Sequence, residues 1–395
     1  MILQLNTESK LTFITLILIF LVTIQFYFHE NHQFSEKSSP TFTNDFHVHH
    51  INSTQPSKIP KKSSPTKKND TNFNHIKSFD PFPYQFLHIV GNPDGTITRL
   101  QEFFPTIPAS NNIDFNSYSI SKDVLLDPRK NTWVRIFLPQ KSINNPKKLP
   151  IVVFVHGGGF ILYNPASPLF HNFCSELASQ LDVLVISVEY RLAPENRLPA
   201  AYEDVFEALL WVKDGKNEWV KKYGNFSRCI LMGHSAGGNI VYNVMLTALD
   251  YVNDLRPLTI AGFVLIQPAF GGIKRTGSEL RSVYDPMTPL VVGDLMWDLA
   301  LPVGAGQGHE FCDPTIGGGP EKLGRIRKLG WWVVVVGCDG DPLIDREVRL
   351  FEMLKKKGVM AKSLFTKGGY HSVHLIDPVQ MRQLFVYIEK LFKEL

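Results

Sequence analysis

The segment GHSAGGN (residues 233–239) holds a serine whose spacing suits a nucleophile. Ser235 lies between two glycines in a GxSxG pattern, after an apolar run and before a segment with helical spacing. A tight strand–turn–helix needs glycines at these positions, and it lifts the serine hydroxyl above the sheet at the helix N-terminus. The alternative is that Ser235 is only the N-cap of an ordinary turn. We predict that Ser235 attacks an electrophilic substrate.

A nucleophilic serine also needs hydrogen-bond donors for the oxyanion of its tetrahedral intermediate. The segment HGGGF (residues 156–160) follows another apolar run, and glycines leave backbone N–H groups free of obstruction by a Cβ. We predict that the N–H groups of Gly158, Gly159 and Ala236 form an oxyanion hole. His156 is interpreted as a brace for the glycine loop rather than as a base.

The base that activates the serine needs a carboxylate to orient it. The segment CDGDPLID (residues 338–345) offers three aspartates, Asp339, Asp341 and Asp345. Asp341 precedes a proline, so it is also a good N-cap for the helix that follows. The chain order serine, acid, histidine favours Asp341 as the acid and His371, in YHSVHL, as the base. His374 is interpreted as a packing neighbour.

These residues lie at the ends of short apolar, β-branched runs, which is typical of strands covered on both faces. The runs are at 151–156, 183–190, 229–234, 261–266, 331–337 and 361–366. Segments with helical spacing lie between them or follow them, at 170–181, 200–214, 236–250, 346–358 and 380–395. This alternation predicts an α/β fold with a mostly parallel, doubly wound sheet.

The globular domain is predicted to span residues 79–395. Residues 271–328 form a long, Gly/Pro-rich insertion with a helical stretch at 292–302. Together with residues 81–115 it is predicted to form a cap over the carboxyl ends of the strands, where ligands bind in such sheets. The Phe- and Trp-rich composition of these segments suggests an apolar substrate.

The N-terminal segment differs from the rest. Residues 11–28 contain no charged side chain and meet the lower length limit for a membrane-spanning helix. We predict that residues 1–30 form a hydrophobic segment with an uncleaved single-pass membrane anchor, and that residues 31–78, which are polar and lack periodicity, form a disordered linker. A cytoplasmic location is expected if the anchor is not used.

Composition excludes other classes of function. The chain has 395 residues and a formal net charge of +4 with mixed signs, which gives nucleic acid no basic face. The four cysteines are widely spaced, so neither a zinc site nor a disulfide framework is expected. They are predicted to be buried: Cys174, Cys229, Cys312 and Cys338. Three glycosylation sequons permit a lumenal location of the chain: Asn52, Asn69 and Asn225.

From about residue 80 onward the sequence resembles the plant carboxylesterases of the hormone-sensitive-lipase branch of the α/β-hydrolases. The matching motifs are HGGGF, YRLAPENRLPAAYED (190–204), GHSAGGN, LALPVGAGQGHEFCDP (299–314), DGDPLID and YHSVHL. The resemblance implies an α/β-hydrolase domain that hydrolyses small-molecule carboxylic esters by a triad of Ser235, Asp341 and His371. It implies no metal or organic cofactor.

The gibberellin receptors belong to the same branch, and they bind a hormone without hydrolysis because an apolar residue replaces the triad histidine. A receptor is therefore the alternative function, and His371 favours the hydrolase. A serine peptidase is disfavoured by the HGGG and YRLAPE motifs. The chain departs from the family in two places: YHSVH replaces the usual EHGFH, and the first seventy-odd residues have no familiar counterpart.

Overall fold

The computed structural model describes residues 81–112 and 118–394. The predictions for residues 1–30 and 31–78, including the membrane anchor at 11–28, lie outside the described residues. Within the described ranges no helix has the length and apolar character needed to cross a membrane.

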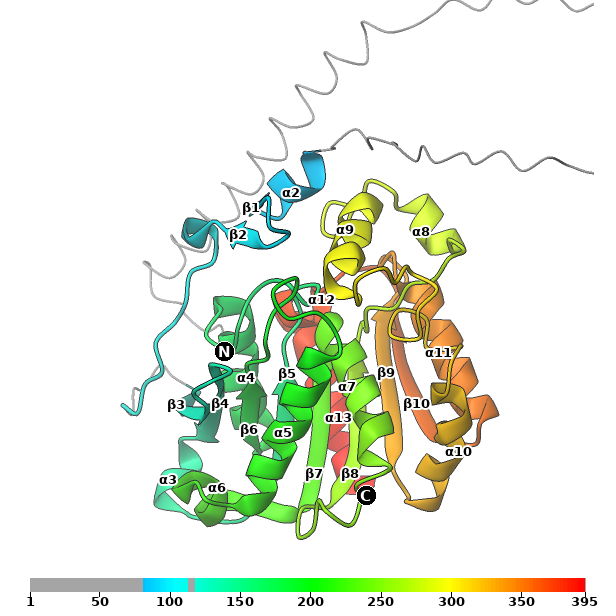
Figure 1. Cartoon of the computed structure of the whole chain (residues 1–395). Helices are drawn as coiled ribbons and strands as arrows, with labels where there is room; N and C mark the ends of the chain where they lie inside the picture. Colours follow the sequence, from blue (N-terminus) through cyan, green and yellow to red (C-terminus); the bar gives the residue numbers. More distant parts are fainter. Residues whose placement is uncertain (1–80, 113–117, 395) are drawn as a thin grey trace, which may run out of the picture. The chain divides into compact units, whose positions relative to one another are not determined.

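An eight-stranded sheet forms the centre of the described chain (Figure 1). Its strand order is β10-β9-β8-β7-β5-β6-β4-β3, and β4 runs antiparallel to both of its neighbours while the other pairs are parallel. The strands are β3 (Ser119–Asp127), β4 (Thr132–Pro139), β5 (Leu149–Val155), β6 (Leu184–Val188), β7 (Gly224–His234), β8 (Ile260–Ile266), β9 (Trp332–Cys338) and β10 (Met360–Thr366). The predicted mostly parallel sheet is confirmed; β3 and β4 were not predicted.

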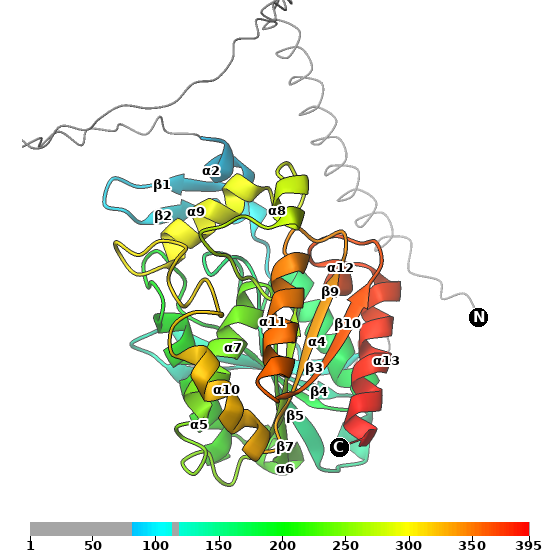
Figure 2. The same ribbon diagram turned by 90° about the vertical axis from the view of Figure 1, so that its right-hand side faces the viewer.

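Helices cover both faces of the sheet (Figure 2). One face packs against α4 (Pro168–Leu181) and α13 (Pro378–Glu394). The other packs against four helices, α5 (Ala200–Asp214), α7 (Ala236–Ala248), α10 (Gly319–Lys328) and α11 (Ile344–Lys356). Along β5, Val152 and Phe154 belong to the first core, while Ile151, Val153 and Val155 belong to the second. Because successive side chains enter different cores, the strand is apolar at nearly every position.

Several short elements lie beyond the strand ends, at the same end of the sheet as α12 (Val373–Ile376) (Figure 1). They comprise α2 (Phe82–Phe86), the antiparallel pair β1 (Ile89–Gly91) and β2 (Ile97–Arg99), α8 (Gly277–Arg281) and α9 (Leu290–Ala300). α2 contacts α9, so the N-terminal segment and the insertion meet there. The remaining short helices are η1 (Gln101–Phe103), α3 (Lys141–Asn144) and α6 (Glu218–Tyr223). The cap at 81–115 and 271–328 stays a prediction.

A buried ion pair connects the insertion to helix α11, which packs on the sheet. Arg346 of α11 donates to Glu279 of α8 at 2.9 Å, and both residues are less than 5% exposed. Glu279 also closes a capping box with Thr276, so its carboxylate serves the helix and the ion pair together. The start of α8 is thereby fixed against α11.

Candidate active site

Ser235 occupies the sharp turn between β7 and α7. Its backbone has φ 54° and ψ −120°, a strained conformation for a residue with a side chain. The turn closes tightly, because a Cβ on Gly233 would overlap the carbonyl of Gly237, and one on Gly237 would overlap the carbonyl of Val155. These contacts explain the two glycines of GxSxG. They place the hydroxyl at the carboxyl end of the sheet, where β7 stops.

The three predicted residues of the triad come together at this edge. His371 Nε2 lies 2.9 Å from Ser235 Oγ, and His371 Nδ1 lies 2.8 Å from Asp341 Oδ2. All three side chains are buried, at 8% exposure or less. His371 follows β10 and Asp341 follows β9, so three parallel strands supply the group.

The other two aspartates have different partners. Asp339 is exposed and accepts from the backbone of Gly368, and Asp345 accepts from the backbone of Ser278 at the start of α8. Asp341 also makes the local turn that the sequence suggested, since its Oδ1 accepts the N–H of Leu343 at 2.9 Å. One oxygen therefore stabilises the turn while the other contacts His371.

Gln267 is a member of the site that sequence reasoning missed. Its Nε2 donates to Asp341 Oδ2 at 2.6 Å and to the carbonyl of Tyr370 at 3.1 Å, and its Oε1 accepts the N–H of Ser372 at 2.9 Å. The side chain thus joins the aspartate to both neighbours of His371 in the chain. A signal existed: Gln267 is the first polar residue after the apolar strand β8, at the edge of the sheet where ligands bind.

The charge of Asp341 tunes the histidine. Burial lowers the pKa of His371, but the charge of Asp341, its hydrogen bond and the charge of Asp285 outweigh burial and raise the pKa above 6.5. Two neighbouring histidines behave differently. Burial lowers the pKa of His374 to about 4, and burial together with His371 and His374 lowers the pKa of His234 well below 6.5. Both therefore stay neutral near neutral pH.

The glycine loop approaches the serine from β5. Gly158 and Gly159 have φ values of 105° and 60°, which favour glycine. In the described part of the chain, the N–H groups of Gly158, Gly159 and Ala236 have no protein acceptor. They are free to bind an anionic oxygen.

His156, which the sequence analysis interprets as a brace, lies under this loop. Its ring is fully buried and stacks on Tyr190 at 4.3 Å between centroids. Its Nδ1 lies 2.8 Å from the carbonyl of Gly157, and Tyr190 Oη donates to the carbonyl of His156 at 3.2 Å. These contacts hold the start of the glycine loop in place.

A small, mainly apolar pocket of about 80 Å³ opens onto Ser235 and His371. The insertion supplies much of its wall, including Met296 and Trp297 of α9. A Cβ on Gly159 would overlap the Met296 thioether, so this side chain lies against the glycine loop. The sequence did not identify which insertion residues line the pocket, because their positions depend on how α9 packs.

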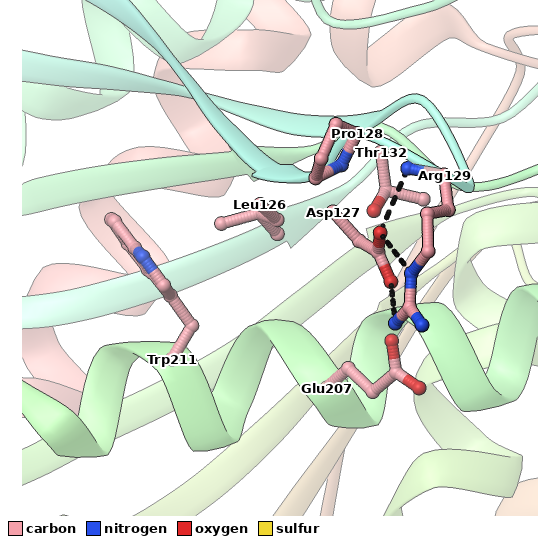
Figure 3. A pocket seen from close by; sticks show the side chains of 7 residues that line it. All are labelled: Leu126, Asp127, Pro128, Arg129, Thr132, Glu207 and Trp211. Atoms are coloured by element: carbon pink, nitrogen blue, oxygen red, sulfur yellow. Dashed lines mark hydrogen bonds and ion pairs between the residues drawn. The ribbon is translucent and has the colours of Figure 1, made fainter.

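A larger hollow of about 420 Å³ lies elsewhere, between the β3–β4 turn and α5 (Figure 3). Its lining includes Asp127 and Arg129, which are hydrogen-bonded to each other, and the side chain of Trp211. It contains no pair of nucleophile and base. Size alone therefore does not identify the active site.

All four cysteines are free and buried, as predicted. Among residues 81–112 and 118–394, no group of three or more His, Cys, Asp or Glu side chains is arranged to hold a metal ion.

Comparison with known proteins identifies the family. A family model described as alpha/beta hydrolase fold matches residues 152–375. The chain is 46% identical to carboxylesterase 20 of Arabidopsis thaliana over 78% of this chain and 95% of the relative. It is 44% identical to 3-O-acetylpapaveroxine carboxylesterase CXE1 of Papaver somniferum over 78% of this chain and 96% of the relative.

Solved structures support the fold. An esterase from the archaeon Pyrobaculum calidifontis aligns with a TM-score of 0.58 and 24% identity, over 69% of this chain and 83% of that structure. At this identity the likeness concerns the fold alone. The family model and the plant relatives show that the chain belongs to the plant carboxylesterases of the hormone-sensitive-lipase-like branch of the α/β-hydrolases, and that it is a carboxylic ester hydrolase.

Proposed function

We propose that this protein is a serine carboxylesterase in which Ser235 is the nucleophile, His371 the general base and acid, and Asp341 the residue that orients the base. The observation that carries this proposal is the continuous chain of contacts from Ser235 Oγ to His371 at 2.9 Å and from His371 to Asp341 at 2.8 Å. Such a chain lets imidazole accept the serine proton during attack, while the carboxylate stabilises the imidazolium that forms.

The reaction has two halves. Ser235 Oγ attacks the ester carbonyl carbon as His371 Nε2 takes the hydroxyl proton, and His371 then gives this proton to the departing alcohol. The acyl-serine is hydrolysed by water, which loses a proton to His371 as it attacks. The carboxylic acid leaves when the proton returns to Ser235. No cofactor takes part in this scheme.

The oxyanion hole is proposed to consist of the N–H groups of Gly158, Gly159 and Ala236. They have no protein acceptor among the described residues, and Ala236 is the first residue of α7, where helix N–H groups are unpaired. Hydrogen bonds to the developing oxyanion lower the barrier, and removal of one donor typically costs about 10²–10³-fold in rate.

We propose small-molecule esters with a short acyl group, such as acetates, as the substrate class. The pocket beside Ser235 has a volume of about 80 Å³. The wall is mainly apolar, which suits a methyl group. A relative that is 44% identical is named for an acetylated compound, 3-O-acetylpapaveroxine.

The receptor alternative receives no support from the site. His371 contacts Ser235, whereas the receptor hypothesis requires that this position lack a base. A serine peptidase remains disfavoured by the HGGG and YRLAPE motifs.

We also propose the domain plan predicted from the sequence. Residues 81–115 and 271–328 would act as the cap of a hydrolase domain at 79–395, supported by the contact of α2 with α9. Residues 11–28 would anchor the chain in a membrane and 31–78 would link the anchor to the domain. The apolar, uncharged composition of 11–28 supports this plan.

A fluorophosphonate probe tests the proposed nucleophile. The activated serine displaces fluoride and keeps the phosphonyl group, and mass spectrometry locates the labelled residue. We expect labelling at Ser235 that is lost in Ser235→Ala and in His371→Ala. Ser282, which lines the same pocket, provides the matched control Ser282→Ala, which should label like the wild type. Labelling that persists in Ser235→Ala would refute the proposal.

A further inference from the structure

Glu347 is a fully buried carboxyl group directly behind the proposed triad. It lies in the first turns of α11 and is 0% exposed. Its carboxyl group lies against β9, because a Cβ on Gly337 would overlap Glu347 Oε2. Gly337 is thus needed to make room for this acid. The arrangement places Glu347 beside Asp341, in the turn that joins β9 to α11.

Among the residues that the structure describes, no cationic side chain forms an ion pair with Glu347. The ionisable groups that interact with it are Asp341 and the buried thiol of Cys338 at the end of β9. On the neighbouring elements, the cation Arg346 is already paired with Glu279 of α8. An ionised, buried carboxylate next to another carboxylate would be costly.

The hydrogen bonds lead to the same conclusion. As an ionised carboxylate, Glu347 would have no donor for either oxygen within residues 81–112 and 118–394. As a protonated acid it can donate a hydrogen bond, and the carboxylate of Asp341, the group that acts on it most strongly after burial, is the acceptor within its surroundings. Asp341 already accepts from three groups, His371, Gln267 and the N–H of Leu343, and a protonated Glu347 would be a fourth donor.

We propose that Glu347 is a positioning residue that stays protonated and donates a hydrogen bond to Asp341, so that one proton and one negative charge are shared by two buried carboxyls behind His371. This inference rests on the proposed triad. The shared proton fixes the Asp341 carboxyl in the plane that meets His371 Nδ1. It also keeps a second negative charge away from the histidine.

The protonation state has a consequence for stability. Burial first, and then the charge and hydrogen bond of Asp341, raise the pKa of Glu347 well above 4.5. An acid whose pKa is raised on folding contributes stability that is fully present below its unfolded pKa and is lost as pH rises through the folded value. Glutamine at this position keeps a neutral donor and does not titrate.

The pH dependence of stability therefore distinguishes a protonated Glu347 from an ionised one. We expect the Tm of Glu347→Gln minus that of the wild-type full chain to increase steadily between pH 4.5 and pH 8. The control is Glu352→Gln, an exposed glutamate on the same helix, whose difference from wild type should stay constant. A constant difference for Glu347→Gln as well would show that Glu347 is not a protonated donor and would overturn the inference.

Kinetics test the positioning role. Glu347→Gln should keep kcat for p-nitrophenyl acetate within about threefold of wild type, while Glu347→Leu should lose about tenfold in kcat at unchanged KM. Equal losses in the two variants, or none in Glu347→Leu, would contradict the proposal. If Glu347→Leu does not fold, the pH dependence of the Tm difference between Glu347→Gln and the wild type still tests the proposal. Failure of the triad itself would appear separately, as turnover that persists in Ser235→Ala.

Discussion

Replacement of Gln267 by methionine removes the amide that joins Asp341 to the loop around His371. Methionine has nearly the same volume as glutamine, so the substitution removes mainly polar contacts. These are the 2.6 Å hydrogen bond to Asp341, the acceptor of the Ser372 N–H and a donor to the Tyr370 carbonyl. A buried polar group left without a partner costs about 1–3 kcal/mol. The Tyr370 carbonyl keeps the Cys338 thiol as a donor at 3.6 Å. The Ser372 N–H is then the group left without a partner, so the free energy of unfolding should fall by about 1–3 kcal/mol.

The same substitution also removes contacts that hold Asp341 and the loop around His371 in position. Loss of one hydrogen bond to a charged group, worth about 1.5–3 kcal/mol, corresponds to a fall in kcat/KM of roughly 10–100-fold if it acts wholly on the transition state. Urea unfolding and p-nitrophenyl acetate kinetics measure the two effects. Gln180→Met, on the exposed side of α4, is the matched control. Wild-type kcat/KM together with unchanged stability in Gln267→Met would refute the reasoning.

Three further predictions concern the base, the pocket and the ion pair. The base must be neutral to act, and the pKa of His371 is raised, so kcat/KM should fall as pH drops through a midpoint above 6.5; a pH–rate profile with its midpoint below 6 would disagree. Met296→Ala should widen the pocket and raise the butyrate-to-acetate ratio of kcat/KM several-fold, and an unchanged ratio would count against the assigned wall. Arg346→Met leaves Glu279 buried without its cation, so the free energy of unfolding measured in urea should fall by about 3–5 kcal/mol. The double variant Arg346→Met/Glu279→Gln should recover most of this loss, and no recovery would contradict this account.

The parts of the site that could be predicted are those whose backbone demands specific residues. The turn at Ser235 excludes side chains at Gly233 and Gly237, and this steric need is visible as GxSxG. The parallel strands could also be predicted, because both of their faces are buried and their sequences are therefore continuous apolar runs. Strands β3 and β4 were not predicted: β3 lies at the sheet edge and is partly exposed, so its residues lack a continuous apolar run.

Other members of the site depend on contacts between distant segments. Gln267 contacts Asp341 and Tyr370, 74 and 103 positions away, and no local pattern distinguishes it from another polar residue at a strand end. Glu347 has the spacing of a helix residue in a charged segment, and its burial follows only from the packing of α11 on Gly337. Met296 reaches the glycine loop through the position of α9, which the sequence does not specify.

The most direct test of the central claim is the pre-steady-state release of p-nitrophenol from p-nitrophenyl acetate by the full chain. The triad predicts steady turnover in the wild type and a fall in kcat of about 10⁴–10⁶-fold in His371→Ala and in Ser235→Ala. A folded His371→Ala protein that keeps wild-type turnover would contradict the assignment of the base, and a wild type that binds the ester without releasing p-nitrophenol would contradict the esterase itself.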